Sequence, residues 1–470
     1  MRITTSLASA TALLAVTAFT PHASRQEVLR KAMPTARPLT TRSIQKTTQT
    51  TTASDVATAA NTFIGTLTAA QRTTLLQTLN STNVTKWSNL PCGSQCRIGL
   101  QFSSLTTAQQ TAALAVVQAA TGTGANEGYQ EIQEIRAADD YLAANGGGNN
   151  YGSGIYFIAF LVTNTSNTTI GATDQWMLQF GGHHLATNIS YNNGYVTGPT
   201  PKFEGVEPLS FTSTGGIFTS GTTVAPLNDE EAGMAALFAS LTSTQKATAK
   251  LSQTFSDVVL GPGSDGQFPT TRVGLQCSTL TSAQQALVVA AMAPWVKDVD
   301  DATGTQLLNY YQTQLANTYI SYSGTGLFTS NADYARIDGP NAWVEFVCQT
   351  GVVFRNNIHY HSIYRDRARD YGGNFYGTYT TVLGTKSAAA ATVFSLFPNP
   401  AYSGADLQVR LASASAGTYV VRDLLGRQVA TGPVQNSEAA VPTTGIVPGT
   451  YLLTVETPGQ AAVTSRFQVQ

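Results

Sequence analysis

A short pattern that begins a helix occurs four times along the chain. In each copy a leucine precedes a threonine, and a glutamine follows three positions after that threonine. Threonine at an N-cap with glutamine at the third helical position forms a capping box, and the preceding leucine suits a hydrophobic staple. The four threonines are Thr68, Thr106, Thr242 and Thr281. We therefore expect a helix to begin at each of them.

Strand-like segments follow these helices. The stretches 155–162, 175–180 and 342–354 are rich in β-branched and aromatic residues, which fit a pleated, half-buried surface. Because each part of the chain runs from helices to strands without alternating them, the pattern indicates an α+β fold and not a series of βαβ units.

A long internal match indicates a duplication. Residues 97–106 align with residues 272–281 at an offset of 175 positions, and the first capping threonine recurs at an offset of 174. We therefore expect two related halves, about 57–232 and 233–384, packed about a pseudo-twofold axis.

A third unit follows a simple linker at 385–393. From residue 394 to residue 470, short apolar stretches are separated by glycine and proline turn signals, which predicts a small all-β sandwich. Its expected strands are 407–411, 418–422, 451–455 and 466–469. The fold class expected for the chain is α+β, with a duplicated central domain at 57–384 followed by this sandwich.

The N-terminus has the features of an export signal. Met1-Arg2 gives a short positive start, residues 7–20 are largely apolar, and residues 21–23 offer a small residue for cleavage. This pattern predicts a secretory signal peptide over 1–23, followed by a basic, threonine-rich leader over 24–56. We expect no transmembrane segment in the rest of the chain, because no later apolar run is long enough.

Composition limits the partners and the compartment. The 470 residues are 42% apolar and only 11% charged, with a net charge of −1, which argues against nucleic acid or another highly charged partner. Export places the cysteines in an oxidising compartment. We expect a disulfide between Cys92 and Cys96, while Cys277 and Cys348 either pair or remain buried thiols.

Four segments characterise the C-terminal unit. They are 397–401 (FPNPA), 421–429 (VRDLLGRQV), 447–453 (VPGTYLL) and 466–470 (RFQVQ). This set resembles the type A sorting domain of the type IX secretion system. The resemblance implies that the type IX secretion machinery carries the protein across the outer membrane of a Bacteroidetes-type bacterium. Removal of the domain and release or surface attachment would follow.

The central region carries its own set of motifs. They are 176–188 (WMLQFGGHHLATN), 200–208 (TPKFEGVEP), and 343–345 (WVE) leading to 359–366 (HYHSIYRD) and 370–372 (DYG). Together they resemble the family named domain of unknown function 3500, over most of the central domain. The resemblance supplies no reaction, so the chemistry must be inferred from the residues.

Four of the five histidines fall in two clusters, and the fifth, His22, lies in the expected signal peptide. The clusters are His183-His184 and the pair His359 and His361. Residues two apart on a strand point to the same face, so the second pair can bind one ion. Imidazole is a common ligand of zinc, copper and iron. The clusters predict a metal site; the alternative is that these are hydrogen-bonded structural histidines.

Adjacent residues on a strand point to opposite faces. Only one of His183 and His184, with His184 preferred, is therefore expected to bind the same ion, unless the Gly181-Gly182 pair bends the chain. We expect this histidine to meet the other cluster in one cleft between the halves. The alternative is one cluster in each of two equivalent clefts.

Four charged residues are the candidate catalytic groups. Glu204 and Glu207 can complete a histidine metal site or act as a general base. Arg365 can hold a carboxylate or an oxyanion, and Asp366 can orient a ligand histidine. The alternatives are solvated loop acids for the two glutamates and ordinary salt bridges for the other two residues.

Two classes of function fit these patterns. The first is an exported metal-dependent enzyme acting on a small-molecule or polymer substrate, either a hydrolase or an oxidase that uses copper or iron. The second is an extracellular or cell-surface binding protein in which the histidines are structural. The sequence has no clear phosphate-binding or dinucleotide-binding motif, so we expect no organic cofactor.

Overall fold

The structure, a computed structural model, describes a central domain and a C-terminal domain. The described residues are 52–375, 394–411, 416–423, 427–457 and 463–470. The expected signal peptide, the leader before Thr52 and the linker at 385–393 lie outside the described residues.

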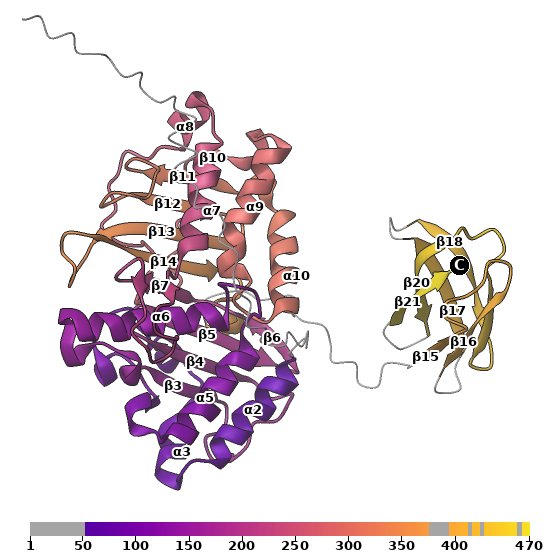
Figure 1. Cartoon of the computed structure of the whole chain (residues 1–470), viewed down its shortest axis with the longest axis horizontal. Helices are drawn as coiled ribbons and strands as arrows, with labels where there is room; N and C mark the ends of the chain where they lie inside the picture. The colour runs from indigo at the N-terminus through magenta and orange to yellow at the C-terminus, as the bar shows by residue number, and fades with distance from the viewer. Residues whose placement is uncertain (1–51, 376–393, 412–415, 424–426, 458–462) are drawn as a thin grey trace, which may run out of the picture. The chain divides into compact units, whose positions relative to one another are not determined.

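The central domain is built on one large sheet of 12 strands (Figure 1). The strands are β1 (Leu76–Thr78), β2 (Leu100–Gln101), β3 (Phe157–Val162), β4 (Trp176–Gly182), β5 (Leu185–Asn192), β6 (Tyr195–Gly198), β7 (Lys202–Val206), β10 (Leu275–Gln276), β11 (Tyr319–Ser323), β12 (Tyr334–Asp338), β13 (Ala342–Thr350) and β14 (Ile358–Asp366). Their order is β1-β3-β4-β5-β7-β14-β13-β12-β11-β10, with β2 paired to β3 and β6 paired to β5.

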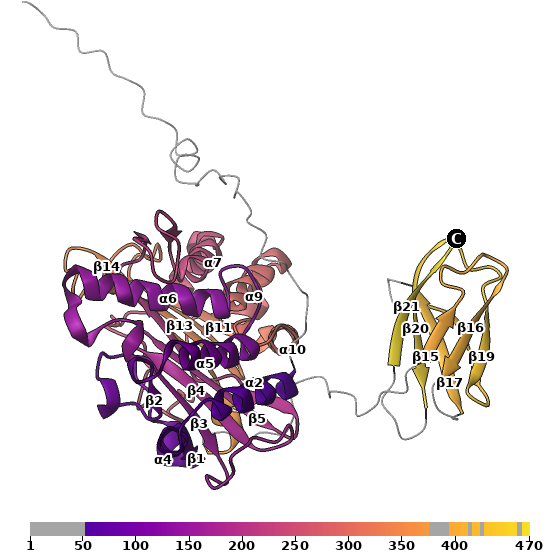
Figure 2. The ribbon, with the colours of Figure 1, turned by 60° about the horizontal axis from the view of Figure 1, so that its bottom comes forward.

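Helices cover one face of this sheet (Figure 2). The helices of the domain are α2 (Ala53–Gly65), α3 (Ala69–Leu75), α4 (Ser81–Val84), α5 (Thr107–Ala120), α6 (Tyr129–Leu142), α7 (Asn228–Ala239), α8 (Ser243–Ala249), α9 (Ser282–Val296) and α10 (Asp301–Gln312). The main core lies between the helical layer and the sheet and includes Phe63, Phe160 and Trp295. A smaller core on the other face includes Phe203 and Trp343.

The four predicted helix starts are confirmed. Thr68, Thr106, Thr242 and Thr281 are the N-caps of α3, α5, α8 and α9, and each forms a complete capping box with its glutamine. The glutamines also join neighbouring helices in pairs. Gln71 Nε2 donates to Gln109 Oε1 at 3.3 Å, and Gln245 Nε2 donates to Gln284 Oε1 at 3.2 Å.

The two parts of the central domain have the same order of strands. The path β2-β3-β4-β5-β7 in the first part corresponds to β10-β11-β12-β13-β14 in the second. Short parallel pairings also recur, since Leu76 pairs with Phe160 and Lys250 pairs with Tyr322. The α+β class is confirmed. The duplication remains a prediction, and the repeated strand order agrees with it.

The boundary of the expected leader needs correction. Residues 53–56, assigned to the leader, form the first turn of α2, and Thr52 caps that helix through Asp55. The segment 342–354 is also not strand throughout, because β13 ends at Thr350.

The C-terminal domain consists of two small sheets. One has the order β15-β16-β19 and the other β18-β17-β20-β21. The strands are β15 (Phe394–Phe397), β16 (Asp406–Leu411), β17 (Gly417–Asp423), β18 (Gln428–Val434), β19 (Glu438–Pro442), β20 (Gly449–Glu456) and β21 (Val463–Val469). Residues from both sheets, among them Leu407, Val421, Leu453 and Phe467, form one buried core. The four expected strands are all present.

Removing one capping hydroxyl in each half should destabilise the central domain by similar amounts. Thr106→Ala and Thr281→Ala each delete the acceptor of a helix N-terminal N–H. We expect each to lower the free energy of unfolding by about 1 kcal/mol in urea denaturation. The adjacent substitutions Thr107→Ala and Ser282→Ala are controls that keep both caps. Equal stability of a cap variant and its control would contradict the assigned role.

Candidate functional site

The first histidine pair lies in the turn of the β4–β5 hairpin. β4 ends at Gly182 and β5 begins at Leu185, so His183 and His184 are the turn residues. His184 has a φ of +61°, a left-handed conformation that is uncommon for residues with a side chain. The two histidines therefore lie where the chain bends, which is the exception that the prediction from sequence allowed, and not on a continuous strand. The turn sets the direction of their side chains.

A disulfide-closed loop supports this hairpin. Cys92 and Cys96 form the expected disulfide. Arg97 lies against it, with Nη1 3.4 Å from the sulfur of Cys96, and its Nη2 donates to the carbonyl of Gly182 at 2.6 Å. The N–H of His184 donates to the carbonyl of Asn89 at 3.1 Å. The loop thus holds the backbone on both sides of His183. Elsewhere, the other two cysteines, 277 and 348, are unpaired and buried.

The second pair lies on β14, at the centre of the sheet. His359 and His361 are two residues apart and point to one face. His361 is opposite Gly205 on β7. A Cβ atom at Gly205 would lie 2.9 Å from Cδ2 of His361 and 3.0 Å from Cδ2 of His184. Glycine at this position therefore leaves the space in which the two histidine clusters meet.

Three histidines form one buried group. His184, His359 and His361 each offer a ring nitrogen, and these atoms all lie within 4.8 Å of one another. The Nε2 atoms of His359 and His361 are 3.3 Å apart. Two imidazoles bound tetrahedrally to zinc at about 2.0–2.1 Å have their nitrogens about 3.3–3.4 Å apart. The separation therefore suits two ligands of one ion.

Neighbouring polar groups orient the rings. Nδ1 of His361 lies 3.0 Å from Oδ1 of Asp257, which leaves its Nε2 directed at His359. Nδ1 of His183 lies 2.6 Å from Oδ1 of Asp139 on α6. His183 is thus held by the helical layer, and its ring stacks on that of His184 with centroids 3.7 Å apart.

Burial keeps His184 and His359 neutral. It lowers the pKa of His184 well below its ordinary value, and the three neighbouring histidines lower it further. Burial, with a contribution from His361, also lowers the pKa of His359 to about 3. For Asp257, burial alone would raise the pKa, but hydrogen bonds from His361, from the backbone N–H of Val258 and from Gln349 outweigh it and hold the pKa below its usual range. Neutral imidazole is the form that binds a metal.

The two candidate glutamates lie apart from each other. On β7, Glu204 is opposite Ser362, whose hydroxyl accepts from the indole N–H of Trp295 in α9. Glu204 therefore faces the helical layer, where Lys202 lies 2.7 Å from its Oε1. Glu207 follows β7, and its Oε1 accepts from the N–H groups of Val353 and Phe354 at 2.9 and 2.7 Å. It holds the hairpin between β13 and β14.

The remaining two candidates are fully engaged in ion pairs. Arg365 donates to Asp370 at 2.9 Å and to the carbonyl of Leu260 at 2.7 Å. Asp366 accepts from Tyr311 at 2.6 Å and from Arg369 at 2.9 Å. Of the eight predicted site residues, the structure brings three histidines into one group and gives each charged candidate partners elsewhere.

Sequence reasoning missed a second group. The carboxylates of Glu131 on α6, Glu204 on β7, Glu230 on α7 and Asp298 before α10 lie within 4.8 Å of one another and are buried. Lys202 forms ion pairs with Glu204 and Asp298. Burial raises the pKa of Glu204 to about 7 and raises those of Glu131 and Glu230 well above the ordinary value. One feature of the sequence pointed to part of this group. Strand alternation places Lys202 and Glu204 on the same face of β7.

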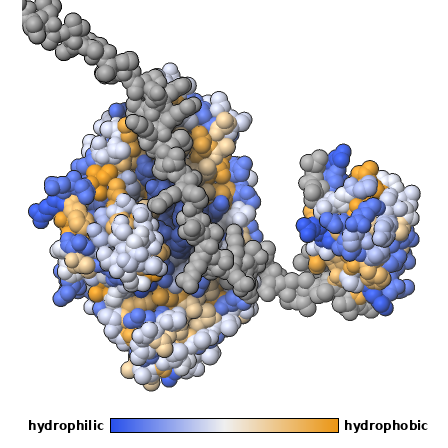
Figure 3. Space-filling model, in the orientation of Figure 1, coloured by the Kyte–Doolittle hydropathy of each residue, from blue (hydrophilic) through white to orange (hydrophobic). Residues whose placement is uncertain are grey.

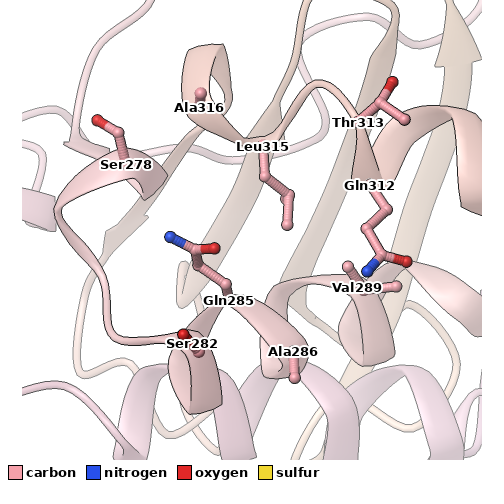
Figure 4. Close-up of a pocket in the computed structure, with 9 residues that line it drawn as sticks. All are labelled: Ser278, Ser282, Gln285, Ala286, Val289, Gln312, Thr313, Leu315 and Ala316. Carbon is pink, nitrogen blue, oxygen red and sulfur yellow. The ribbon is translucent and has the colours of Figure 1, made fainter.

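A surface groove lies apart from both groups (Figure 4). It has a volume of about 560 Å³ and is lined by residues of α9 and of the segment after α10, among them Gln285, Val289 and Leu315. Its lining offers hydrogen bonds and apolar contacts but no acid or base.

Figure 3 shows hydrophobic residues in scattered small groups among hydrophilic and neutral ones on the drawn face.

Comparisons with known proteins identify both domains. Residues 395–470 match a secretion system C-terminal sorting domain; this type IX sorting domain directs proteins to the cell surface or the extracellular space. Among the described residues, every helix is too short or too polar to cross a membrane. No curated protein matches the chain. Residues 49–373 match the model described as protein of unknown function (DUF3500). This match covers more than half of the sequence, and the chain therefore belongs to the DUF3500 family.

Proposed function

We propose that this exported chain is a metal-dependent enzyme whose ion is bound by His184, His359 and His361. The observation that carries the proposal is the 3.3 Å separation of the Nε2 atoms of His359 and His361, with a nitrogen of His184 in the same group. Three imidazoles are a suitable ligand set for zinc, copper or iron.

The ligand set favours hydrolysis. Three protein ligands leave one position of a tetrahedral ion open, as in catalytic zinc sites. Because neutral imidazoles do not cancel the charge of a divalent ion, that charge can polarise a substrate carbonyl or activate water. An oxidase would use copper or iron at the same nitrogens. Asp257, whose side chain is 46% exposed, contacts His361 at 3.0 Å and connects it to solvent.

The two halves contribute unequally to this site. His184 and Gly205 come from the first half, and His359 and His361 come from the second. The matching strand order supports an origin of the domain by duplication. In that account the site formed where β7 and β14 join the halves, so the domain has one shared site and not two equivalent clefts.

The burial of the site supports a second candidate. The three histidines are only 4%, 1% and 5% exposed, which suits a binding protein in which they are structural. A binding protein of this kind would need no metal, and replacing one of its histidines would affect only packing. Metal content therefore separates the two candidates.

Replacing a grouped histidine should remove the metal. We expect the purified wild-type chain to hold about one zinc, copper or iron ion by elemental analysis, and His184→Ala, His359→Ala and His361→Ala each to hold far less. Circular dichroism should report the same fold in each variant. The matched variant His183→Gln should keep the metal, because His183 is held by Asp139 outside the group.

Two results would overturn this assignment. One is a wild-type chain that takes up none of the three metals after loading and dialysis. The other is equal loss of metal from His183→Gln and from His361→Ala, because it would place the ion at a different set of nitrogens.

Asp257 should increase the affinity of the histidine group for its metal without binding the metal itself. Asp257→Asn weakens the carboxylate–histidine contact at 3.0 Å, so we expect metal affinity to fall about 10–100-fold. Competition with a chromophoric chelator measures the change. Asp174→Asn removes the same charge near the far end of the β4–β5 hairpin and should leave affinity unaltered. Equal affinities of the wild type and Asp257→Asn would show that this contact does not orient His361.

A further inference from the structure

We infer that the central domain binds a second cation, a divalent ion of the calcium class, between the carboxylates of Glu131, Glu204, Glu230 and Asp298. This site lies on the helical face of the sheet. The histidine group lies at the other face, because Gly205, the next residue after Glu204, is the one that contacts His361.

The charge of the group, when its acids are ionised, favours a compensating cation. Four carboxylates lie together at exposures of only 0–2%, and uncompensated buried charge is strongly unfavourable. Lys202 supplies one positive charge through its ion pairs with Glu204 and Asp298. Three negative charges remain when all four acids are ionised, and a divalent ion reduces this excess to one.

Unpartnered oxygens provide a second, independent indication. Both carboxylate oxygens of Glu131, both of Glu230 and Oε2 of Glu204 are buried, and no side-chain or backbone donor of another described residue bonds to them. Buried polar atoms are nearly always paired with protein, water or an ion, so each exception needs an explanation. These oxygens belong to side chains that each offer one ligand atom, and those atoms lie within 4.8 Å of one another, so one ion can reach an oxygen of every side chain.

The chemistry of the group selects the ion. A set made only of oxygens suits a hard cation. Calcium accepts about six to eight oxygen ligands in flexible geometry, whereas magnesium usually keeps several waters and binds only about one or two carboxylates. Four carboxylates from the protein therefore suit calcium better than magnesium.

The four ligands join the two halves of the domain. Glu131 and Glu204 belong to the first half and Asp298 belongs to the second, while Glu230 lies on α7, which spans the boundary between them. The helices that carry or border them, α6, α7 and α9, lie on one side of the sheet (Figure 2). Asp298 also accepts from the N–H of Gly128 at 2.5 Å, which fixes the start of α6. A bound ion would therefore stabilise the junction of the halves.

Shared protons are the competing explanation. The carboxyl group of Glu131 lies close enough to Glu204 and Asp298 for a hydrogen bond through a retained proton. Such a cluster would be charge-compensated without a metal, and it would have no preference for calcium over magnesium. The experiment must therefore separate a cation from protons.

The test is thermal unfolding of the full chain after chelator treatment and exchange into metal-free buffer. Calcium chloride at about 100-fold above its dissociation constant should raise the melting temperature by about 3–6 °C, with a smaller rise for magnesium.

Glu131→Gln and Glu230→Gln keep the side-chain shape and remove one charge. Each should melt above the stripped wild type and should lose the calcium response. His361→Ala should keep the full response, which separates this site from the histidine group.

Two results would overturn the inference. The first is found with the metal-free wild type. Its melting temperature would not respond to calcium, and its free energy of unfolding would rise as the pH falls from about 7 towards 4.5. That sign follows from the raised pKa of Glu204, about 7, because the folded state then binds more protons than the unfolded state in this range. The second is a wild type that retains no calcium after loading and gel filtration, where we expect about one ion per chain.

Discussion

The antiparallel pairing of β7 with β14 is the constraint on which the rest of the central domain depends. It joins the two halves into one continuous sheet and fixes five residue pairs, from Tyr360 with Val206 to Tyr364 with Lys202. Because side chains alternate between faces, this register sets both buried groups at once. It places His361 beside Gly205 on one face and Ser362 beside Glu204 on the other. A slip of one residue would turn the histidines of β14 towards the helical layer.

The histidine group also needs the β4–β5 hairpin to approach this central pair. His184 has a strained backbone conformation, and such strain persists only where the surroundings impose it. Here Arg97 ties the disulfide loop to the carbonyl of Gly182, and Asn89 accepts from the N–H of His184. The loop, the turn and the glycine on β7 thus act together. An exported protein can keep the disulfide that this arrangement uses.

Local rules predicted the features that local chemistry controls. The helix starts follow from threonine and glutamine three positions apart, and the shared face of His359 and His361 follows from strand alternation. The turn at His183 and His184 was expected from the sequence only as an alternative, because their β-like neighbours favoured a continuous strand. The roles of Glu204 and Arg365 depend on residues distant in sequence. Glu204 is grouped with Asp298, and Arg365 forms an ion pair with Asp265. Only the register of β7 against β14 and the packing of the helices bring these partners together.

The central claim is that one metal ion joins the two histidine clusters at the β7–β14 pair. The most direct measurement is anomalous X-ray scattering from crystals of the zinc- or copper-loaded protein. The account predicts one strong peak about 2.0–2.1 Å from a ring nitrogen of each of His184, His359 and His361. A loaded crystal without a peak at these nitrogens, or with its peak at other side chains, would contradict it.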